Sequence, residues 1–246
     1  MSAFKPSEFI KELDSYFARE DVSGAANYLI KCRKECEESG DDLSLLTVLN
    51  ELVGFYRQTG QRKKALECID KCFEIIKIAP LDDKTAGTLY LNCATTMKRF
   101  EMSEDAMQYY DKAKRLLTAA LPEDDPLIAG LYNNTALALK DLGRFKEAEE
   151  SYLEAIKITE KDEKNALENA ISLVNLAQLY YDVDFSDERV SPLLDKAIKI
   201  LSSDKYVTYD KYAFTCRNTA TAYGYFGRFA DEKLLNERAD KYYGRA

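Results

Sequence analysis

The chain contains no histidine, which limits the chemistry that its side chains can do. Histidine is the commonest general acid or base and a frequent metal ligand, so a serine or cysteine nucleophile would lack its usual base. Adjacent carboxylates such as Glu149 and Glu150 fall on a predicted solvent-facing side of a helix, which is typical of a solvated surface. No glycine-rich phosphate loop occurs. We therefore expect a protein that is not an enzyme.

Cysteines are the remaining candidates for chemistry, and the chain has six: Cys32, Cys36, Cys68, Cys72, Cys93 and Cys216. The first four form two pairs spaced one helical turn apart, whereas zinc sites usually come from tight CxxC loops. Cys32 and Cys72 also coincide with small packing positions, and buried cysteine behaves as a small hydrophobe. Six cysteines are too few for a disulfide scaffold of this length. We expect reduced thiols, no metal site and no cofactor.

Composition limits the protein class. In 246 residues, 46% are hydrophobic and 32% charged, which supplies both a core and a soluble surface. The low counts of 10 Gly and 5 Pro favour helices with short connections. A net charge of −8 argues against a general nucleic-acid or anionic-membrane binder. The N-terminal stretch lacks the pattern of a signal peptide, and no run reaches the ~20 apolar residues of a membrane span. We expect a cytoplasmic protein.

The chain is built from a helical hairpin that repeats along the sequence, and any functional site must be positioned by these repeats. Residues 132–155 show it best, with two helical stripes of apolar and small residues on either side of Gly143: Tyr132, Thr135, Ala136 and Leu139, then Ala148, Tyr152 and Ala155. The small residue of the first helix recurs at Val53, Ala94, Ala136, Ala177 and Ala220, and that of the second at Cys72, Ala113, Ala155, Ala197 and Ala239. Successive gaps are 41 to 43 residues. Such a repeat buries its apolar faces by stacking on its neighbours.

We predict an all-α fold, an α-solenoid of about six hairpins in a single array over residues 1–246. Its units cover approximately 5–39, 42–79, 83–120, 125–161, 165–203 and 206–244. Gly60, Gly143 and Gly227 are expected to end first helices in the left-handed conformation. In the fifth unit, Pro192 predicts a second helix that either begins late, with Ser191 as its cap, or kinks at the proline, and we favour the late start.

The repeat resembles the tetratricopeptide repeat. The matching pattern in one unit is Leu52-Val53, Tyr56, Gly60, Ala65 and Ile69, with analogous residues in later units. The period of about 42 exceeds the usual 34 residues and is similar to that of kinesin light chains. The resemblance implies a right-handed superhelix in which first helices line a concave groove that binds a peptide or a partner helix.

The groove is predicted from the side of each first helix opposite its inward stripe. Its candidate peptide-binding residues are Asn92, Thr95, Arg99, Asn134, Asn175, Gln178, Asn218 and Tyr225. One asparagine per unit resembles the asparagines that kinesin light chains present to a peptide backbone, since a side-chain amide both donates and accepts hydrogen bonds. The alternative is an asparagine ladder that ties neighbouring first helices together. The sequence leaves both interpretations open.

Few charged residues lie beside the predicted groove residues. Arg57, Lys98 and Lys140 occupy one equivalent place in three units, which indicates either a preference for acidic ligands or an ordinary solvated flank. The family's clamp for a C-terminal carboxylate is not matched, because Gly130 and Ile171 stand where its cations would be. An adaptor for chaperone tails is therefore not expected.

The leading functional prediction is a non-enzymatic interaction module that binds a peptide segment of a partner protein in its groove, without nucleic acid or membrane as a partner. One alternative is a ligand- or peptide-sensing regulator that acts on a partner in trans. Another is a structural homo-oligomer, such as a homodimer, formed through a terminal helix with exposed Leu234, Leu235, Tyr242 and Tyr243.

Overall fold

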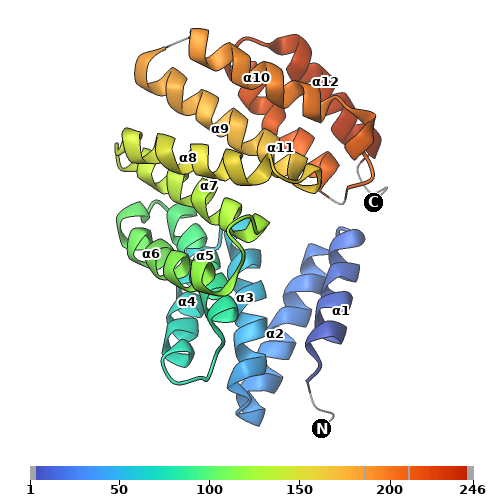
Figure 1. Ribbon diagram of the computed structural model, residues 1–246. Helices are drawn as coiled ribbons and strands as arrows, with labels where there is room; N and C mark the ends of the chain where they lie inside the picture. Colours follow the sequence, from blue (N-terminus) through green and yellow to red (C-terminus); the bar gives the residue numbers. More distant parts are fainter. Residues whose placement is uncertain (1–3, 186, 210, 243–246) are drawn as a thin grey trace. The chain divides into compact units, whose positions relative to one another are not determined.

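The computed structural model describes residues 4–185, 187–209 and 211–242 (Figure 1). These residues form twelve α-helices and two short 3-10 helices, and no strand occurs among them. The all-α prediction is confirmed.

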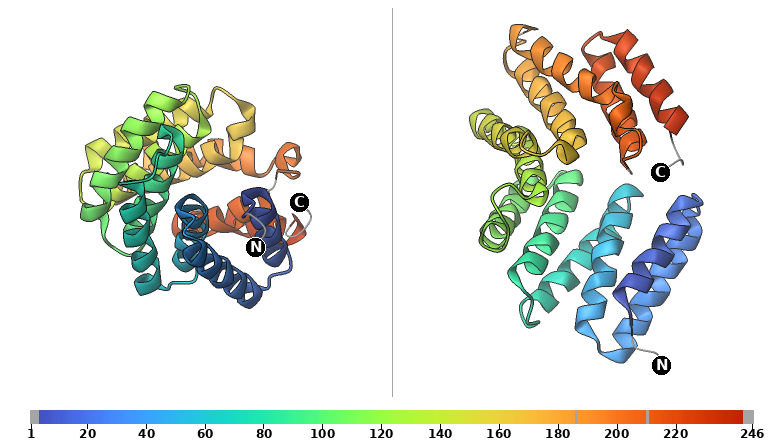
Figure 2. Two further views of the ribbon diagram at one scale, coloured as in Figure 1. Left: turned by 90° about the horizontal axis from the view of Figure 1, so that it is seen from below. Right: turned by 45° about the vertical axis from the view of Figure 1, so that its right-hand side comes forward.

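The helices pair into hairpins, each a first helix and a second helix joined by a short connection (Figures 1 and 2). The pairs are α1 (Pro6–Ala18) with α2 (Val22–Ser39), α3 (Asp42–Gln58) with α4 (Arg62–Ile76), α5 (Asp83–Arg99) with α6 (Ser103–Ala120), α7 (Pro126–Asp141) with α8 (Phe145–Thr159), α9 (Ala166–Asp184) with α10 (Asp187–Leu201), and α11 (Tyr212–Tyr225) with α12 (Phe229–Tyr242). The 3-10 helices η1 (Glu163–Asn165) and η2 (Asp204–Tyr206) lie in the connections before α9 and α11.

The chain divides into two compact units, residues 1–120 with α1–α6 and residues 121–246 with α7–α12. Within the first unit, α3 packs against α2, α4 and α5. Within the second, α9 packs against α7, α8, α10 and α11. The first helices α3 and α5, α7 and α9, and α9 and α11 are thus neighbours inside their units, and a single continuous array with a right-handed twist stays a prediction.

Small residues allow the helices of a hairpin to approach closely. The five small residues of the first helices and the five of the second helices are all at most 1% exposed: Val53, Ala94, Ala136, Ala177, Ala220, Cys72, Ala113, Ala155, Ala197 and Ala239. A larger side chain at such a crossing would force the two backbones apart. The repeat register read from the sequence is therefore confirmed.

Three first helices begin at an aspartate one residue before the helix. The carboxylates of Asp41, Asp82 and Asp125 accept hydrogen bonds from backbone N–H groups two or three residues later, at 3.1, 2.9 and 2.8 Å. Each thereby satisfies one of the free donors of the first turn. The same carboxylates of Asp41 and Asp82 also accept side-chain hydroxyl bonds, which together lower their pKa values.

The turns inside the hairpins use the left-handed conformation. Gly60, Gly143 and Gly227 have φ of +69°, +71° and +72°, as predicted for the residue that ends a first helix. At the corresponding turns of the third and fifth hairpins, Glu101 and Phe185 take this conformation, with φ of +64° and +54°. A phenylalanine is an unusual choice there.

The prediction for Pro192 was wrong. Helix α10 begins at Asp187, and Pro192 lies inside it, so Ser191 is not its cap. Val190 and Leu194 lie on one face and are 2% and 1% exposed, so the buried stripe already runs through the residues before the proline. The proline ring is exposed, and it removes only one hydrogen bond, close to the helix start where the freed carbonyl can meet water.

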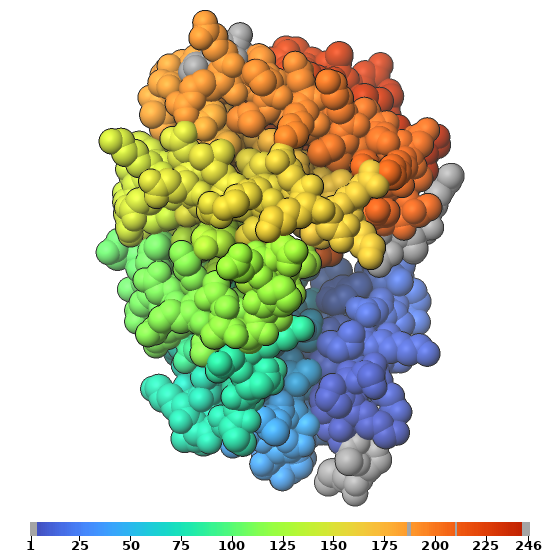
Figure 3. All heavy atoms as spheres, viewed as in Figure 1, coloured from blue at the N-terminus to red at the C-terminus, as the bar shows by residue number. Residues whose placement is uncertain are grey.

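Side chains fill the spaces that the ribbons leave between neighbouring helices of the second unit (Figure 3). Within the described ranges, none of the helices combines the length and the apolar character needed to cross a membrane.

Candidate functional site

The predicted groove residues lie on four first helices and are divided between the two units. The first unit holds Asn92, Thr95 and Arg99 on α5, and the second holds Asn134 on α7, Asn175 and Gln178 on α9, and Asn218 and Tyr225 on α11. Arg99, Asn218 and Tyr225 are exposed, and the other five are half-buried. Each unit therefore carries its own set of predicted residues.

In the first unit, Asn92 joins α5 to α3. Its amide nitrogen donates to the side-chain oxygen of Asn50 at 2.8 Å and to the Asn50 carbonyl at 3.1 Å. Its oxygen accepts from Arg57 Nη1 at 2.7 Å, and Arg57 also donates to Thr96 Oγ1 at 3.2 Å. Both donor and acceptor capacity of the Asn92 amide are thus used between two neighbouring helices.

This network lies in a poorly solvated place. Desolvation lowers the pKa of the Arg57 guanidinium, and desolvation raises the pKa of the nearby Glu51 carboxyl. Asn50 donates to Glu51 Oε1 at 3.3 Å. A buried polar network of this kind fixes how two helices sit against each other, because each member left unpaired would be costly.

The other two predicted residues of α5 differ from Asn92. Thr95 Oγ1 donates to the Leu91 carbonyl at 2.8 Å and accepts from the Tyr110 hydroxyl at 3.4 Å. Arg99 is exposed in the last turn, where its charge complements the helix dipole.

In the second unit, Asn175 joins α9 to α7 in a similar manner. Its amide nitrogen donates to Asn133 Oδ1 at 3.1 Å, and Ser172 Oγ donates to the same oxygen at 3.3 Å. Asn50 and Asn133 were not among the predicted residues. They occupy the same place in the repeat, 83 residues apart, and this spacing is a signal that could have identified them.

Helix α11 presents its predicted residues differently. Asn218 is exposed and lines a hollow of about 380 Å³ together with Phe214, Arg217 and Asp240. Arg217 pairs with Asp240 and donates to Asn236 Oδ1 at 3.3 Å, so it is held by α12. Among the residues described, Asn218 has no hydrogen-bond partner for its side chain, and its amide faces solvent.

The last turns of the first helices carry aromatic and acidic side chains. The Tyr225 hydroxyl donates to Asp182 Oδ1 at 3.3 Å, and Asp182 also pairs with Lys140 Nζ at 2.6 Å. Desolvation, followed by the charge of Asp182, raises the pKa of Tyr225. Lys140 and Arg57 therefore each bind a side chain on the next first helix. Neither is a solvated lysine or arginine on the helix flank, and neither is an unpaired cation that awaits an acidic ligand.

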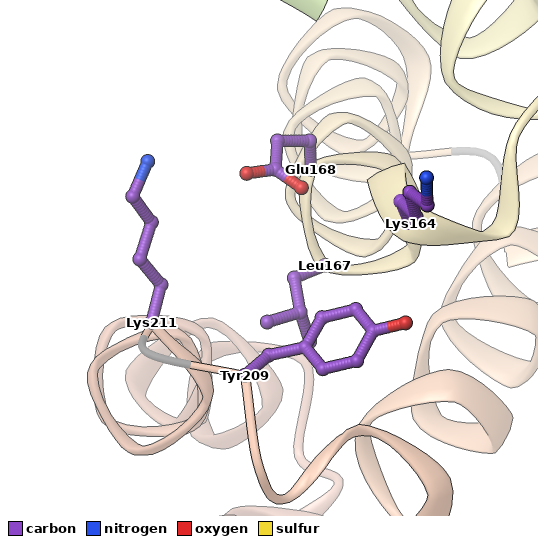
Figure 4. Close-up of a pocket in the computed structure, with 5 residues that line it drawn as sticks. All are labelled: Lys164, Leu167, Glu168, Tyr209 and Lys211. Carbon is purple, nitrogen blue, oxygen red and sulfur yellow. The ribbon is translucent and has the colours of Figure 1, made fainter. Parts of the chain in front are cut away.

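A second hollow lies where α9 and α11 begin. It measures about 350 Å³ and is lined by Lys164, Leu167, Glu168, Tyr209 and Lys211. The Tyr209 ring and the Leu167 side chain lie close together at its base, with the charged side chains around them (Figure 4). Its size is at the lower end of the range for small-ligand sites.

The six cysteines are buried thiols of the helical core. All six are buried and free of disulfides, and burial raises the pKa values of Cys36 and Cys68 to about 11. Within the described ranges no group of three or more metal-ligating side chains comes together. Thiols with raised pKa values are poor nucleophiles at neutral pH.

The surface expected on the terminal helix is smaller than predicted. Leu235 is fully buried in the hairpin with α11, because it belongs to the packing stripe with Ala239, so its predicted exposure was wrong. Leu234 and Tyr242 are half-buried, and Tyr243 lies outside the described residues.

Comparison with known proteins identifies the repeats. Residues 46–77 and 129–162 match the tetratricopeptide repeat family model, and these ranges cover most of α3–α4 and α7–α8. No curated protein sequence matches the chain.

Several solved structures share the fold. BtubC (BKLC) from P. vanneervenii is 19% identical with a TM-score of 0.61, over 91% of this chain and 90% of that one. A protein from Podosopora anserina, provisionally assigned as a kinesin light chain with nearly identical TPR-like repeats, is 16% identical with a TM-score of 0.52, over 81% and 95%. YrrB, described as a TPR protein with an unusual peptide-binding site, is 19% identical with a TM-score of 0.50, over 80% and 87%. The helical hairpins, the two matched tetratricopeptide repeats and these structures agree on an all-α helical-repeat fold.

Proposed function

We propose that the protein is a non-enzymatic interaction module that binds an extended peptide segment of a partner protein on the first-helix face of its second unit, along α11. The observation that carries the proposal is an exposed row on this helix at successive turns: Phe214, Asn218, Thr221 and Tyr225. Phe214 and Tyr225 are 58% and 55% exposed, which is unusual for large side chains next to a free amide.

The row has the chemistry that an extended peptide needs. The Asn218 amide can donate to a peptide carbonyl and accept from a peptide N–H, whatever the peptide sequence. The aromatic side chains on either side offer rigid apolar contacts at little entropic cost. The Asn175 amide donates a hydrogen bond to Asn133 and so holds α9 against α7. We therefore assign peptide binding to Asn218 and not to Asn175. The description of YrrB as having a peptide-binding site supports the same use of a related fold.

The proposal is tested by photo-crosslinking followed by measured affinity. A photoreactive residue at Thr221 of the full chain captures partners in the native cell, and the crosslinked partner peptide is identified and synthesised. We expect Asn218→Ala to weaken binding of that peptide about tenfold, equal to about 1.4 kcal/mol. The matched control is Leu153→Ala on α8, also an exposed large residue of the second unit. Equal affinities for wild type and Asn218→Ala, or an equal loss in Leu153→Ala, would contradict the proposal.

The hollow of Figure 4 supports a second function, a ligand-sensing regulator that acts on a partner in trans. Its apolar base and surrounding charges suit a small ligand with an apolar body and an ionised group. In a thermal-shift screen of such compounds, a true ligand raises the melting temperature of wild type but not of Lys211→Glu. A screen without stabilising compounds would count against this function.

A further inference from the structure

The hollow at the start of α9 and α11 has an apolar base that is held in place. Leu167 is 3% exposed, and the half-buried Tyr209 ring lies beside it (Figure 4). The Tyr209 ring packs edge to face on Tyr206, with ring centroids 5.5 Å apart. The Tyr206 hydroxyl in turn donates to Glu163 Oε1 at 3.1 Å. The segments that precede α9 and α11 thus fix the aromatic part of the base.

Three charged side chains line the hollow, and none of them has a partner within the described ranges. The side chains of Lys164, Glu168 and Lys211 form no ion pair or hydrogen bond with any residue that the structure describes. Lys205 on the preceding 3-10 helix η2 differs, because it pairs with Glu163. The three charges of the hollow are therefore available to a bound molecule.

The missing pair between Lys164 and Glu168 has a structural cause. Elsewhere in the chain, lysines pair with a glutamate four residues later on the same α-helix, as at Lys31, Lys34, Lys63 and Lys233. Lys164 has this spacing to Glu168 but lies in η1, and the tighter turn of a 3-10 helix changes the direction in which its side chain leaves the backbone. The change from η1 to α9 therefore leaves the Glu168 carboxylate unpaired.

Unpaired charges of opposite sign lie on two sides of the apolar base. Glu168 projects from the first turn of α9, and Lys211 directly precedes α11 (Figure 4). A molecule with one charge would neutralise one of these side chains and leave the other unpaired. A molecule with an ammonium group, a carboxylate and an apolar body can pair with both and cover the base between them.

We propose that the hollow binds a free α-amino acid with a large apolar side chain. The carboxylate of this ligand pairs with Lys211, and its ammonium group pairs with Glu168. Its side chain lies on Leu167 and the Tyr209 ring, where apolar area is removed from water. The volume of about 350 Å³ falls within the range of small-molecule sites. The inference rests on the ligand-sensing function proposed above and names the class of its ligand.

The test is an NMR titration of the full chain with L-phenylalanine. Two matched compounds keep the ring and one charge each: N-acetyl-L-phenylalanine has only the carboxylate, and L-phenylalanine amide has only the ammonium group. We expect saturable shifts of the Leu167, Glu168 and Tyr209 amides with L-phenylalanine. Each matched compound is expected to bind about fivefold more weakly, which equals the loss of one exposed ion pair of about 1 kcal/mol.

Two outcomes of the titration would overturn the inference. One is the absence of saturable shifts at these three amides. The other is a matched compound that binds as tightly as L-phenylalanine. Equal binding of the acetylated compound would assign the hollow to the C-terminus of a peptide, and equal binding of the amide would assign it to an N-terminus.

Variants assign each charge of the ligand to its partner. Lys211→Gln is expected to weaken binding of L-phenylalanine about fivefold but to leave L-phenylalanine amide, which has no carboxylate, almost unchanged. Glu168→Gln is expected to weaken L-phenylalanine by a similar factor and to leave N-acetyl-L-phenylalanine almost unchanged. Neither substitution removes a contact within the described part of the chain, so both variants are expected to melt as wild type does.

Lys146→Gln is the matched control. Lys146 is an exposed lysine of α8 that also lacks a partner among the described residues, and its variant is expected to keep wild-type affinity for L-phenylalanine. An equal loss in Lys146→Gln, or unchanged affinity in both variants of the hollow, would contradict the inference.

The inference and the sensing function fail separately. If L-phenylalanine does not bind, but another compound stabilises wild type and not Lys211→Glu, the amino-acid inference fails and the sensing function stands. If L-phenylalanine binds through Lys211 and Glu168 but leaves the amount of partner crosslinked at Thr221 unchanged, the amino-acid site stands and the regulatory function fails.

Discussion

Asn92 and Asn218 occupy the same place in their repeats but have opposite surroundings. Asn92 uses both ends of its amide to join α5 to α3, through Asn50 and Arg57. Asn218 stands exposed on α11 with its amide open to solvent. The comparison teaches that a repeat position fixes where a side chain lies, while its neighbours decide whether it holds helices together or remains available for a ligand.

The largest expected effect breaks the packing of one hairpin in the second unit, the unit that holds Asn218. Ala136→Phe places a large ring where α7 and α8 cross, at a residue with no exposed surface. We expect a loss of about 3 kcal/mol in the free energy of unfolding through overpacking, measured by urea denaturation. Ala230→Phe, at an exposed residue of α12, is the control and is expected to change stability little. Equal stabilities of the two variants would refute the repeat register.

The next effect sharpens the comparison inside the first unit. Arg57→Met keeps much of the side-chain volume but removes the donors to Asn92 and Thr96. We expect a loss of about 2 kcal/mol in the free energy of unfolding, because a hydrogen bond from a charged group is lost and a half-buried amide oxygen is left unpaired.

Its counterpart in the second unit is Lys140→Met, which breaks a more exposed ion pair with Asp182. That change is expected to cost less than about 1 kcal/mol after solvent screening. If Lys140→Met lowered the free energy of unfolding more than Arg57→Met, this would contradict the claim that the more buried polar network lies in the first unit.

A smaller effect concerns the cap of α3, the helix that carries Asn50. Asp41→Ala removes the acceptor for the Ser44 N–H and hydroxyl and is expected to cost about 1 kcal/mol at pH 7. The hydrogen bonds from Ser44 lower the pKa of Asp41, so this stabilisation is present above the unfolded pKa of about 3.9 and is lost as the pH falls through the lower folded value. The difference between wild type and variant should therefore shrink below about pH 4 in urea denaturation. A difference that persists unchanged at low pH would contradict this role.

The smallest effect compares two tyrosines at one repeat position. The Tyr110 hydroxyl meets Thr95 Oγ1, whereas the buried Tyr152 hydroxyl has no hydrogen-bond partner within the described part of the chain. In the second unit, Leu137 stands where Thr95 stands in the first. We expect Tyr110→Phe to cost about 0.5–1 kcal/mol and Tyr152→Phe to be neutral or stabilising, since removing an unpaired buried hydroxyl removes its desolvation penalty. Thermal melts of both variants check this, and a larger loss in Tyr152→Phe would contradict it.

The sequence was enough to predict the fold because packing in a repeat is local and periodic. Ala136 and Cys72 could be identified as buried from spacing alone, and Gly143 could be identified as a left-handed turn. Pro192 was misread because its exposed position near a helix start matters more than the general rule against proline.

The candidate site was harder to predict because its role depends on contacts between repeats. The link from Asn92 to Asn50 joins residues 42 apart, and Arg57 on α3 reaches the same amide on α5. Periodicity placed Asn92 and Asn218 on the same face of their first helices. It could not show that the Asn92 amide is hydrogen-bonded to neighbouring residues while the Asn218 amide, within the part of the chain that the structure describes, is not. The strain at Phe185 was likewise invisible, since nothing in its local sequence requires a left-handed phenylalanine.

The most direct test of the account is the free energy of unfolding of Asn92→Ala and Asn218→Ala, measured side by side by urea denaturation. Loss of the Asn92 amide breaks its bonds to Asn50 and leaves Arg57 only its longer hydrogen bond to Thr96, so we expect a cost of about 2 kcal/mol. Loss of the exposed Asn218 amide is expected to cost less than about 0.5 kcal/mol. Equal costs, or the greater cost at Asn218, would contradict the claim that one repeat position is structural on α5 and available for binding on α11.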